Sequence, residues 1–141
     1  MVHVASPLAR SFENEDEVVT PAVNGTLAVV RACSANNVRR LVVTSSIAAC
    51  QALAATDKPA DKTFNETHWS NPDRPEGMGF YIKSKTLAEK AAWDFHAALP
   101  DGEGKFELAT ILPGFIGGPP LRTEDFASGG FCKRLLTGQV E

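Results

Sequence analysis

Tyr81 and Lys85 lie four residues apart, a spacing that could support proton transfer. On a helix, positions i and i+4 share a face, so the phenol and the ammonium group would be neighbours. A free phenol has a pKa near ~10, so its ionisation at neutral pH costs about 4 kcal/mol, and an adjacent cation lowers that cost. The pair therefore makes Tyr81 a candidate proton donor to a carbonyl group.

Thr44-Ser45-Ser46 supply hydroxyl groups that could complete such a site. They follow Leu41-Val42-Val43, a run typical of a buried strand in a parallel sheet. An isolated Y-x-x-x-K match is usually a surface tyrosine beside a solvated lysine. Here the pair follows a hydroxyl-bearing strand end, which favours function. A serine hydrolase is disfavoured, because neither Ser45 nor Ser46 lies in a G-x-S-x-G turn.

Alternating strands and helices are predicted to position these residues. Tyr81 begins a helical pattern that continues to Leu99, and residues 50–79 form a long polar loop with three prolines. Runs of strand, helix and strand with right-handed crossovers predict an α/β fold, part of a Rossmann-type parallel sheet flanked by helices. The predicted strands are 1–5, 41–44 and 106–112, and the predicted helices are 13–35, 81–99 and 128–138.

In an open parallel sheet, ligands bind beyond the carboxyl ends of the strands. Ala5-Ser6-Pro7, Thr44-Ser45-Ser46 and Pro113-Gly114-Phe115 each follow a predicted strand. We therefore expect these three stretches to lie together, facing the start of the Tyr81 helix.

Composition narrows the class of protein further. The chain has 141 residues, 43% of them apolar, and a net charge of −3, which predicts one domain or part of one and argues against nucleic-acid binding. No stretch resembles a signal peptide or a membrane span, so we expect a cytoplasmic protein. Three cysteines without C-x-x-C spacing suggest reduced thiols, and His3, His68 and His96 lack metal-ligand spacing, so no metal site is proposed.

Four segments resemble the extended short-chain dehydrogenase/reductases, most of all the branch of dihydroflavonol, cinnamoyl-CoA and methylglyoxal reductases. The resemblance implies reduction of an aldehyde or ketone to an alcohol by NADP(H), with NAD possible, and a small-molecule carbonyl or alcohol substrate. The segments are His3–Pro7, Pro21–Thr26, Val42–Ser46 and Tyr81–Trp93.

The same resemblance assigns roles to individual residues. Ser46, the last residue of the T-S-S run, would bind the substrate carbonyl, Tyr81 would donate the proton, and Lys85 would hold the nicotinamide ribose and ease ionisation of the tyrosine. Gln51 would join Ser46 and Tyr81 in contacting substrate. The implied cofactor-binding residues are Val4, Ala5, Ser6, Thr44, Ser45, Tyr81, Lys85, Pro113, Gly114, Phe115 and Ile116.

One feature of the family has no counterpart here. The family opens with a glycine-rich turn that binds the cofactor's pyrophosphate, and no stretch of this chain matches that pattern. We therefore expect residues 1–141 to form the central and C-terminal part of an NAD(P)-binding domain, with the substrate-binding region starting at about 115–141. Two alternatives stay open: a catalytically incomplete fragment, and a sugar-nucleotide epimerase or 3-beta-hydroxysteroid dehydrogenase of the same fold. Whether Asn24 supports a proton relay is left unassigned.

Overall fold

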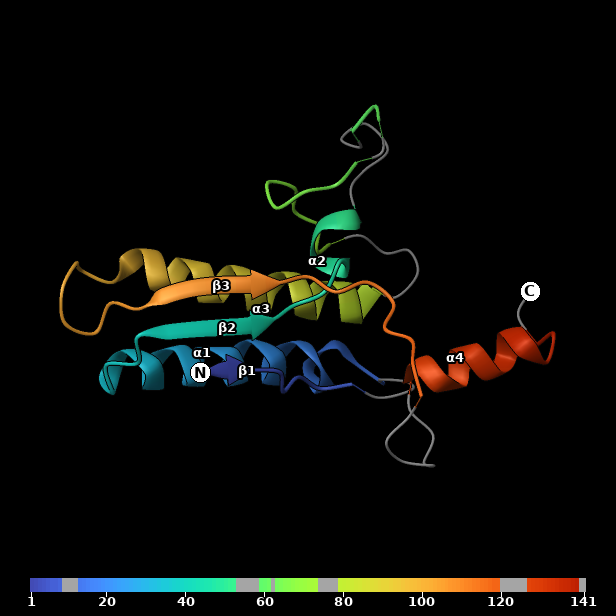
Figure 1. The fold of residues 1–141 in the computed structure, drawn as a ribbon, viewed down its shortest axis with the longest axis horizontal. Coiled ribbons are helices and arrows are strands. Elements are labelled where there is room, and N and C mark those ends of the chain that lie inside the picture. Colours follow the sequence, from blue (N-terminus) through green and yellow to red (C-terminus); the bar gives the residue numbers. More distant parts are fainter. Residues whose placement is uncertain (9–12, 53–58, 62, 74–78, 120–126, 140–141) are drawn as a thin grey trace.

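Three apolar segments form a parallel sheet whose strands follow the order of the chain (Figure 1). In this computed structural model β1 is Val2–His3, β2 is Arg40–Thr44 and β3 is Glu107–Ile111. His3 pairs with Val43, and Thr44 pairs with Ile111. The structure describes residues 1–8, 13–52, 59–61, 63–73, 79–119 and 127–139.

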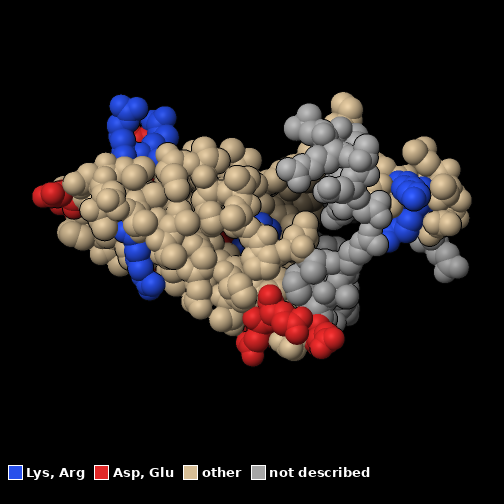
Figure 2. All heavy atoms as spheres, turned by 90° about the horizontal axis from the view of Figure 1, so that it is seen from below, with Lys and Arg blue, Asp and Glu red and all other residues tan. Residues whose placement is uncertain are grey.

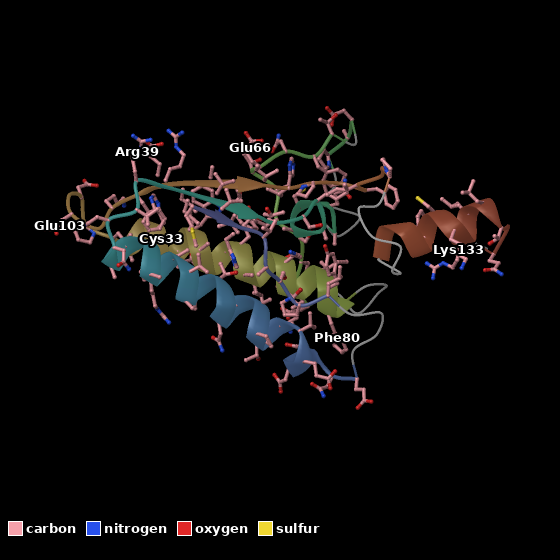
Figure 3. All side chains as sticks on the ribbon, turned by 60° about the horizontal axis from the view of Figure 1, so that its bottom comes forward. Cys33, Arg39, Glu66, Phe80, Glu103 and Lys133 are labelled. Atoms are coloured by element: carbon pink, nitrogen blue, oxygen red, sulfur yellow. The ribbon has the colours of Figure 1, made fainter. Side chains whose placement is uncertain are left out.

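Two long helices, α1 (Val19–Ala35) and α3 (Gly79–Ala98), cover one face of this sheet (Figure 3). Each connects two neighbouring strands, and two successive right-handed crossovers in the same direction place both helices on one side. Their contact with the sheet forms the core. Its buried residues are Val30, Cys33, Leu41, Val43, Ala92 and Phe106. The predicted α/β class, a Rossmann-type parallel sheet with flanking helices, is confirmed.

The start of the first helix differs from the prediction of one helix over 13–35. A short 3-10 helix, η1 (Glu15–Glu17), precedes α1, and the Asn14 side chain caps it by accepting from the Glu17 amide. Pro21 lies in the first turn of α1, where a helix needs no N–H from it. The helix ends as predicted, because Asn37 turns the backbone to a φ of 51°.

The strand β2 has one fully buried face. Leu41 and Val43 face the helices, whereas Val42 and Thr44 are half-buried on the other side. The β-branched run predicted burial on both faces. The described helices that pack on the sheet cover a single face, so alternate residues of β2 have different environments.

The predicted loop at 50–79 begins later than expected. A one-turn helix, α2 (Ala48–Gln51), follows β2 directly. It is held by the buried Ser70, whose Oγ donates to the Ala48 carbonyl at 2.6 Å and accepts from the Ala52 amide at 2.8 Å. These bonds hold Ser70, which follows the long loop, against α2. A pairing between residues so far apart in sequence leaves no periodic signal in the sequence.

The last helix, α4 (Ala127–Leu136), extends away from the carboxyl end of the sheet (Figure 1). The spacing predicted that Phe131, Leu135 and Leu136 point inward. That prediction is wrong for the described structure, in which all three are exposed. Phe131 does contact one neighbour, Phe115, with ring centroids 5.5 Å apart.

The segment Glu15–Ala35 is long and apolar enough to pass a test for membrane-spanning helices based on length and composition, with a mean hydropathy of 1.2. This result differs from the expectation that no stretch resembles a membrane span. Core helices of globular domains pass the same test. Here α1 packs against α3 and the sheet, and its buried stripe contains Val30 and Cys33. This packing accounts for the apolar residues of the buried stripe, while 33% of the window that passes the test is buried in total.

Candidate active site

One face of α3 presents polar and aromatic side chains at intervals of four residues. Tyr81, Lys85, Glu89 and Trp93 follow one another along this face, as the helical period requires. Tyr81 and Lys85 are half-buried and Glu89 is buried, so the face is turned toward the rest of the protein. The predicted helix therefore exists and begins two residues earlier, at Gly79.

Lys85 lies close to the carboxyl end of β1. Its charge, added to the larger effect of burial, lowers the pKa of His3, and burial lowers the pKa of Lys85 itself. The ring Nε2 of His3 is 3.4 Å from the Thr26 hydroxyl of α1. Asn24, in contrast, is exposed on α1, whereas Thr26 is buried next to His3.

Ser45, at the end of β2, is bonded directly to α3. Its buried hydroxyl donates to Oε2 of Glu89, and the Trp93 indole N–H lies 3.4 Å from Oε1 of the same carboxyl group. The neighbouring Ser46 is also buried, and its Oγ accepts from the Ala48 amide at 3.2 Å. The two serines that end β2 thus have different partners.

The Pro113-Gly114 turn adjoins the same strand end. The Ser45 amide donates to the Ile111 carbonyl at 2.8 Å, and the Ile47 amide donates to the Pro113 carbonyl at 3.1 Å. A Cβ atom at Gly114 would lie 3.6 Å from Cδ1 of Ile47. The carboxyl ends of β2 and β3 therefore stay paired beyond the strands themselves.

The remaining predicted site residues lie at the carboxyl edge with varied exposure. Thr44 and Ser6 are half-buried, whereas Gln51 is exposed at the end of α2. Their contacts do not join them to Tyr81 or Lys85 in the described structure. Val4, Ala5, Phe115 and Ile116 are exposed.

Lys83, two residues before Lys85, has a different environment. Its Nζ lies 3.0 Å from Oε1 of Glu15 and 3.7 Å from Oδ1 of Asp73, and these acidic partners raise its pKa. Glu15 belongs to the acidic run 13–17. Figure 2 shows acidic side chains gathered at the lower edge of that view. Lys83 and Lys85, two lysines of the Tyr81 helix in different environments, therefore form a natural pair for comparison.

Sequence reasoning gave two residues at this site no role. His3 is expected to be structural or exposed, and its burial fits the structural interpretation. The apolar spacing of α3 leaves Glu89 off the inward face, yet Glu89 is buried. A signal for Glu89 was present, because it continues the four-residue spacing of Tyr81 and Lys85. Its partner Ser45 is 44 residues away in sequence, and no local pattern predicts that bond.

The pKa shift of His3 predicts a dependence of stability on pH. Because the folded-state pKa lies below the ordinary value of 6.5, the unfolded chain binds the proton more readily. The contribution of His3 to the free energy of unfolding is therefore expected to be fully present above pH 6.5. It should be lost as the pH drops through 6.5 toward the lower folded pKa. Urea unfolding between about pH 8 and pH 5 measures this, and a His3→Gln variant should show a flatter profile. An unchanged profile in that variant would show that other groups cause the dependence.

The fold and the carboxyl edge of the sheet define a class of protein. A parallel sheet in chain order, with helices from successive crossovers and polar groups past its carboxyl ends, is part of a Rossmann-type nucleotide-binding domain. The chain belongs to the 3-beta hydroxysteroid dehydrogenase/isomerase family, whose profile matches residues 1–120. The resemblance to extended short-chain dehydrogenase/reductases is thereby confirmed.

Similar proteins are named as reductases. The chain is 36% identical to an anthocyanidin reductase of Vitis vinifera over 141 residues, which cover 96% of this chain and 40% of the relative. It is similar to the crystal structure of Gre2 from Candida albicans in complex with NADPH, with a TM-score of 0.70, 36% identity, and coverage of 86% of this chain and 37% of Gre2. For yeast methylglyoxal/isovaleraldehyde reductase Gre2 with NADPH the TM-score is 0.69 and the identity 30%, with coverage of 86% and 37%. The chain thus spans about 40% of the length of the curated relatives it matches.

Proposed function

We propose that these residues supply the proton-transfer part of an NADP(H)-dependent reductase that converts an aldehyde or ketone to an alcohol. The observation that carries the proposal is the position of α3. Ser45 bonds to Glu89, and Lys85 is close enough to His3 to lower its pKa. The Tyr81 face of α3 therefore lies along the carboxyl ends of β1 and β2, where open parallel sheets bind ligands.

Ser46 is proposed to bind the carbonyl oxygen of the substrate. Its Oγ already accepts from the Ala48 amide, which orients the hydroxyl. No acceptor within the described ranges takes its hydrogen. A serine hydroxyl can donate to a carbonyl oxygen, and such a bond strengthens as negative charge develops there.

Tyr81 is proposed to donate the proton, and Lys85 to stabilise the phenolate that remains. Both side chains are half-buried, so their electrostatic interaction is less screened by water than it would be on an open surface. Burial lowers the pKa of Lys85, which shows that its charge is held in a partly desolvated place. A cation of this kind would bind ribose hydroxyls as well as oppose the phenolate charge.

The residues at the carboxyl edge are proposed to contact the nicotinamide half of the cofactor. Val4, Ala5, Phe115 and Ile116 are exposed there and offer apolar surface. When bound, NADPH supplies the hydride. No glycine-rich turn for the pyrophosphate is present in the sequence, so these residues would hold only one end of the cofactor.

The names of the relatives support a small-molecule carbonyl substrate, and the composition is the reason for proposing a cytoplasmic protein. We also propose that the substrate-binding region starts at about 115–141, where Phe115 contacts Phe131 of α4.

The family match favours one second candidate, a dehydrogenase acting on hydroxysteroids. A panel of aldehydes, ketones, hydroxysteroids and nucleotide sugars distinguishes the classes. Turnover of hydroxysteroids or sugars alone would contradict the reductase assignment.

NADPH binding tests the proposal directly. We expect the purified chain to bind NADPH weakly, because Lys85 contributes at the ribose while the pyrophosphate site is missing. Lys85→Met is expected to weaken binding about tenfold, corresponding to about 1.4 kcal/mol. Fluorescence titration measures the affinity, and Lys83→Met, which removes a lysine paired with Glu15, should leave it unchanged.

Two other results of that titration would count against the proposal. Complete absence of binding to the wild-type chain would favour the alternative of a catalytically incomplete fragment, while leaving the family assignment intact. Equal weakening by Lys83→Met and Lys85→Met would show a general effect of positive charge instead of a site at Lys85.

A further inference from the structure

Glu89 is a buried acidic side chain to which the proposed reaction gives no role. Only 4% of its surface is exposed, although glutamate is almost never fully buried unless it is paired. Lys85 lies one turn earlier on the same helix face, yet the described salt bridges do not join the two. Burial of this group therefore needs partners other than a cation.

Two donors satisfy the carboxyl group. The Ser45 hydroxyl donates to Oε2, and the Trp93 indole N–H donates to Oε1 at 3.4 Å. Trp93 comes from the same helix, one turn later, so its bond fixes the rotamer of Glu89. Ser45 comes from the end of β2, so its bond joins the strand to the helix that bears Tyr81 and Lys85.

We propose that Glu89 is a positioning residue that anchors Ser45 to α3 and thereby sets where Ser46 lies relative to Tyr81 and Lys85. This inference rests on the proposed function for its catalytic meaning. The anchoring itself is a property of the fold and can be measured separately.

The geometry of the turn explains why one bond matters. The turn comprises residues 45–47, which follow β2. Backbone bonds hold it to β3 and the residues after β3, from the Ser45 amide to the Ile111 carbonyl and from the Ile47 amide to the Pro113 carbonyl. Those bonds set its distance to β3, whereas its distance to α3 depends on the packing of α2, which follows the turn, against α3 and on the side chain of Ser45. The Ser45 to Glu89 bond is the described side-chain link between this turn and α3, and a misplacement of about 1 Å can reduce a reaction rate about 10²-fold.

Cys50 provides an internal reporter of this carboxyl group. Burial raises the pKa of its thiol, and the charge of Glu89 raises it further. Removing that charge should therefore lower the pKa of Cys50 and speed its alkylation. Replacing Cys33 and Cys132, the two other cysteines, with Ala isolates the signal.

The test uses Glu89→Leu, which removes both acceptors, and Glu89→Gln, whose amide can accept from Trp93 and donate to Ser45. Asp94→Leu changes an exposed acidic residue of the same helix and serves as the matched control. Amide hydrogen exchange at Ser45 and Ile47 is expected to accelerate at least about tenfold in Glu89→Leu, and to stay near the wild-type rate in Glu89→Gln and Asp94→Leu. Ser45→Ala removes the bond from the other side and should match Glu89→Leu, which keeps the test decisive if the latter does not fold.

Kinetics separate positioning from general stability. If the wild-type chain reduces carbonyls, kcat should fall about 10²-fold in Glu89→Leu with little change in the KM for NADPH, and Glu89→Gln should restore most of it. Unchanged exchange in the folded Leu and Ala variants, or an unchanged kcat in an active chain, would overturn the inference. Accelerated exchange in a chain that reduces nothing would support the anchoring while counting against the proposed function.

Discussion

Replacement of Tyr81 with Phe is expected to lower the rate of carbonyl reduction by about 10²- to 10⁴-fold. The phenyl ring occupies nearly the same volume on α3, so the substitution removes the proton donor with little change in packing. NADPH affinity should stay close to the wild-type value, because the proposed ribose contact comes from Lys85. The loss should therefore appear in kcat, followed by the absorbance of NADPH as it is oxidised.

Chemical modification provides a second measurement of the same residue. Tyr81 is the single tyrosine of the chain, so nitration of tyrosine modifies only this site. We expect nitration of Tyr81 to abolish carbonyl reduction. We expect bound NADPH to slow the nitration. Phe80→Leu, at the exposed preceding position, is the matched control and should leave activity unchanged. A Tyr81→Phe variant with wild-type kcat would remove Tyr81 from the mechanism.

The fold could be predicted from sequence where local pattern and tertiary burial agree. Leu41-Val42-Val43 predicted a central strand, and the spacing after Tyr81 predicted a long helix; both are present. The one-turn helix α2 was missed because it depends on Ser70, which reaches it across the long loop. The exposed Leu135 of α4 shows the opposite error, since apolar spacing indicates an amphipathic helix without revealing what covers it.

The candidate site was predicted in part for the same reason. The rule that ligands bind at the carboxyl ends of strands grouped Ser46 with the Pro113 turn, and the structure places the two stretches side by side. Sequence spacing also put Tyr81 and Lys85 on one helix face. It could not identify the bond between Ser45 and Glu89, or the contact of His3 with Thr26, because each joins distant segments through side chains.

Replacement of Leu41 with Ala is expected to cost about 2–5 kcal/mol of unfolding free energy, the largest loss of stability we predict. Leu41 has no exposed surface and packs in the core between the sheet and the helices. Its truncation removes buried apolar area and leaves a cavity that the central strand cannot close. Since domains of this size are stable by only about 5–15 kcal/mol, much of the total would be lost. Urea unfolding followed by circular dichroism measures the change.

Val42 and Val43 supply the matched control, because they are the same residue type on opposite faces of β2. Val43 is 5% exposed and faces the helices, whereas Val42 is half-buried on the other face. Truncating Val43 to Ala should therefore cost clearly more than truncating Val42, since less apolar surface leaves water at Val42 on folding. Equal costs would contradict the described packing. They would mean that the second face of the sheet is also buried in solution, which is the arrangement that the β-branched run of β2 predicts.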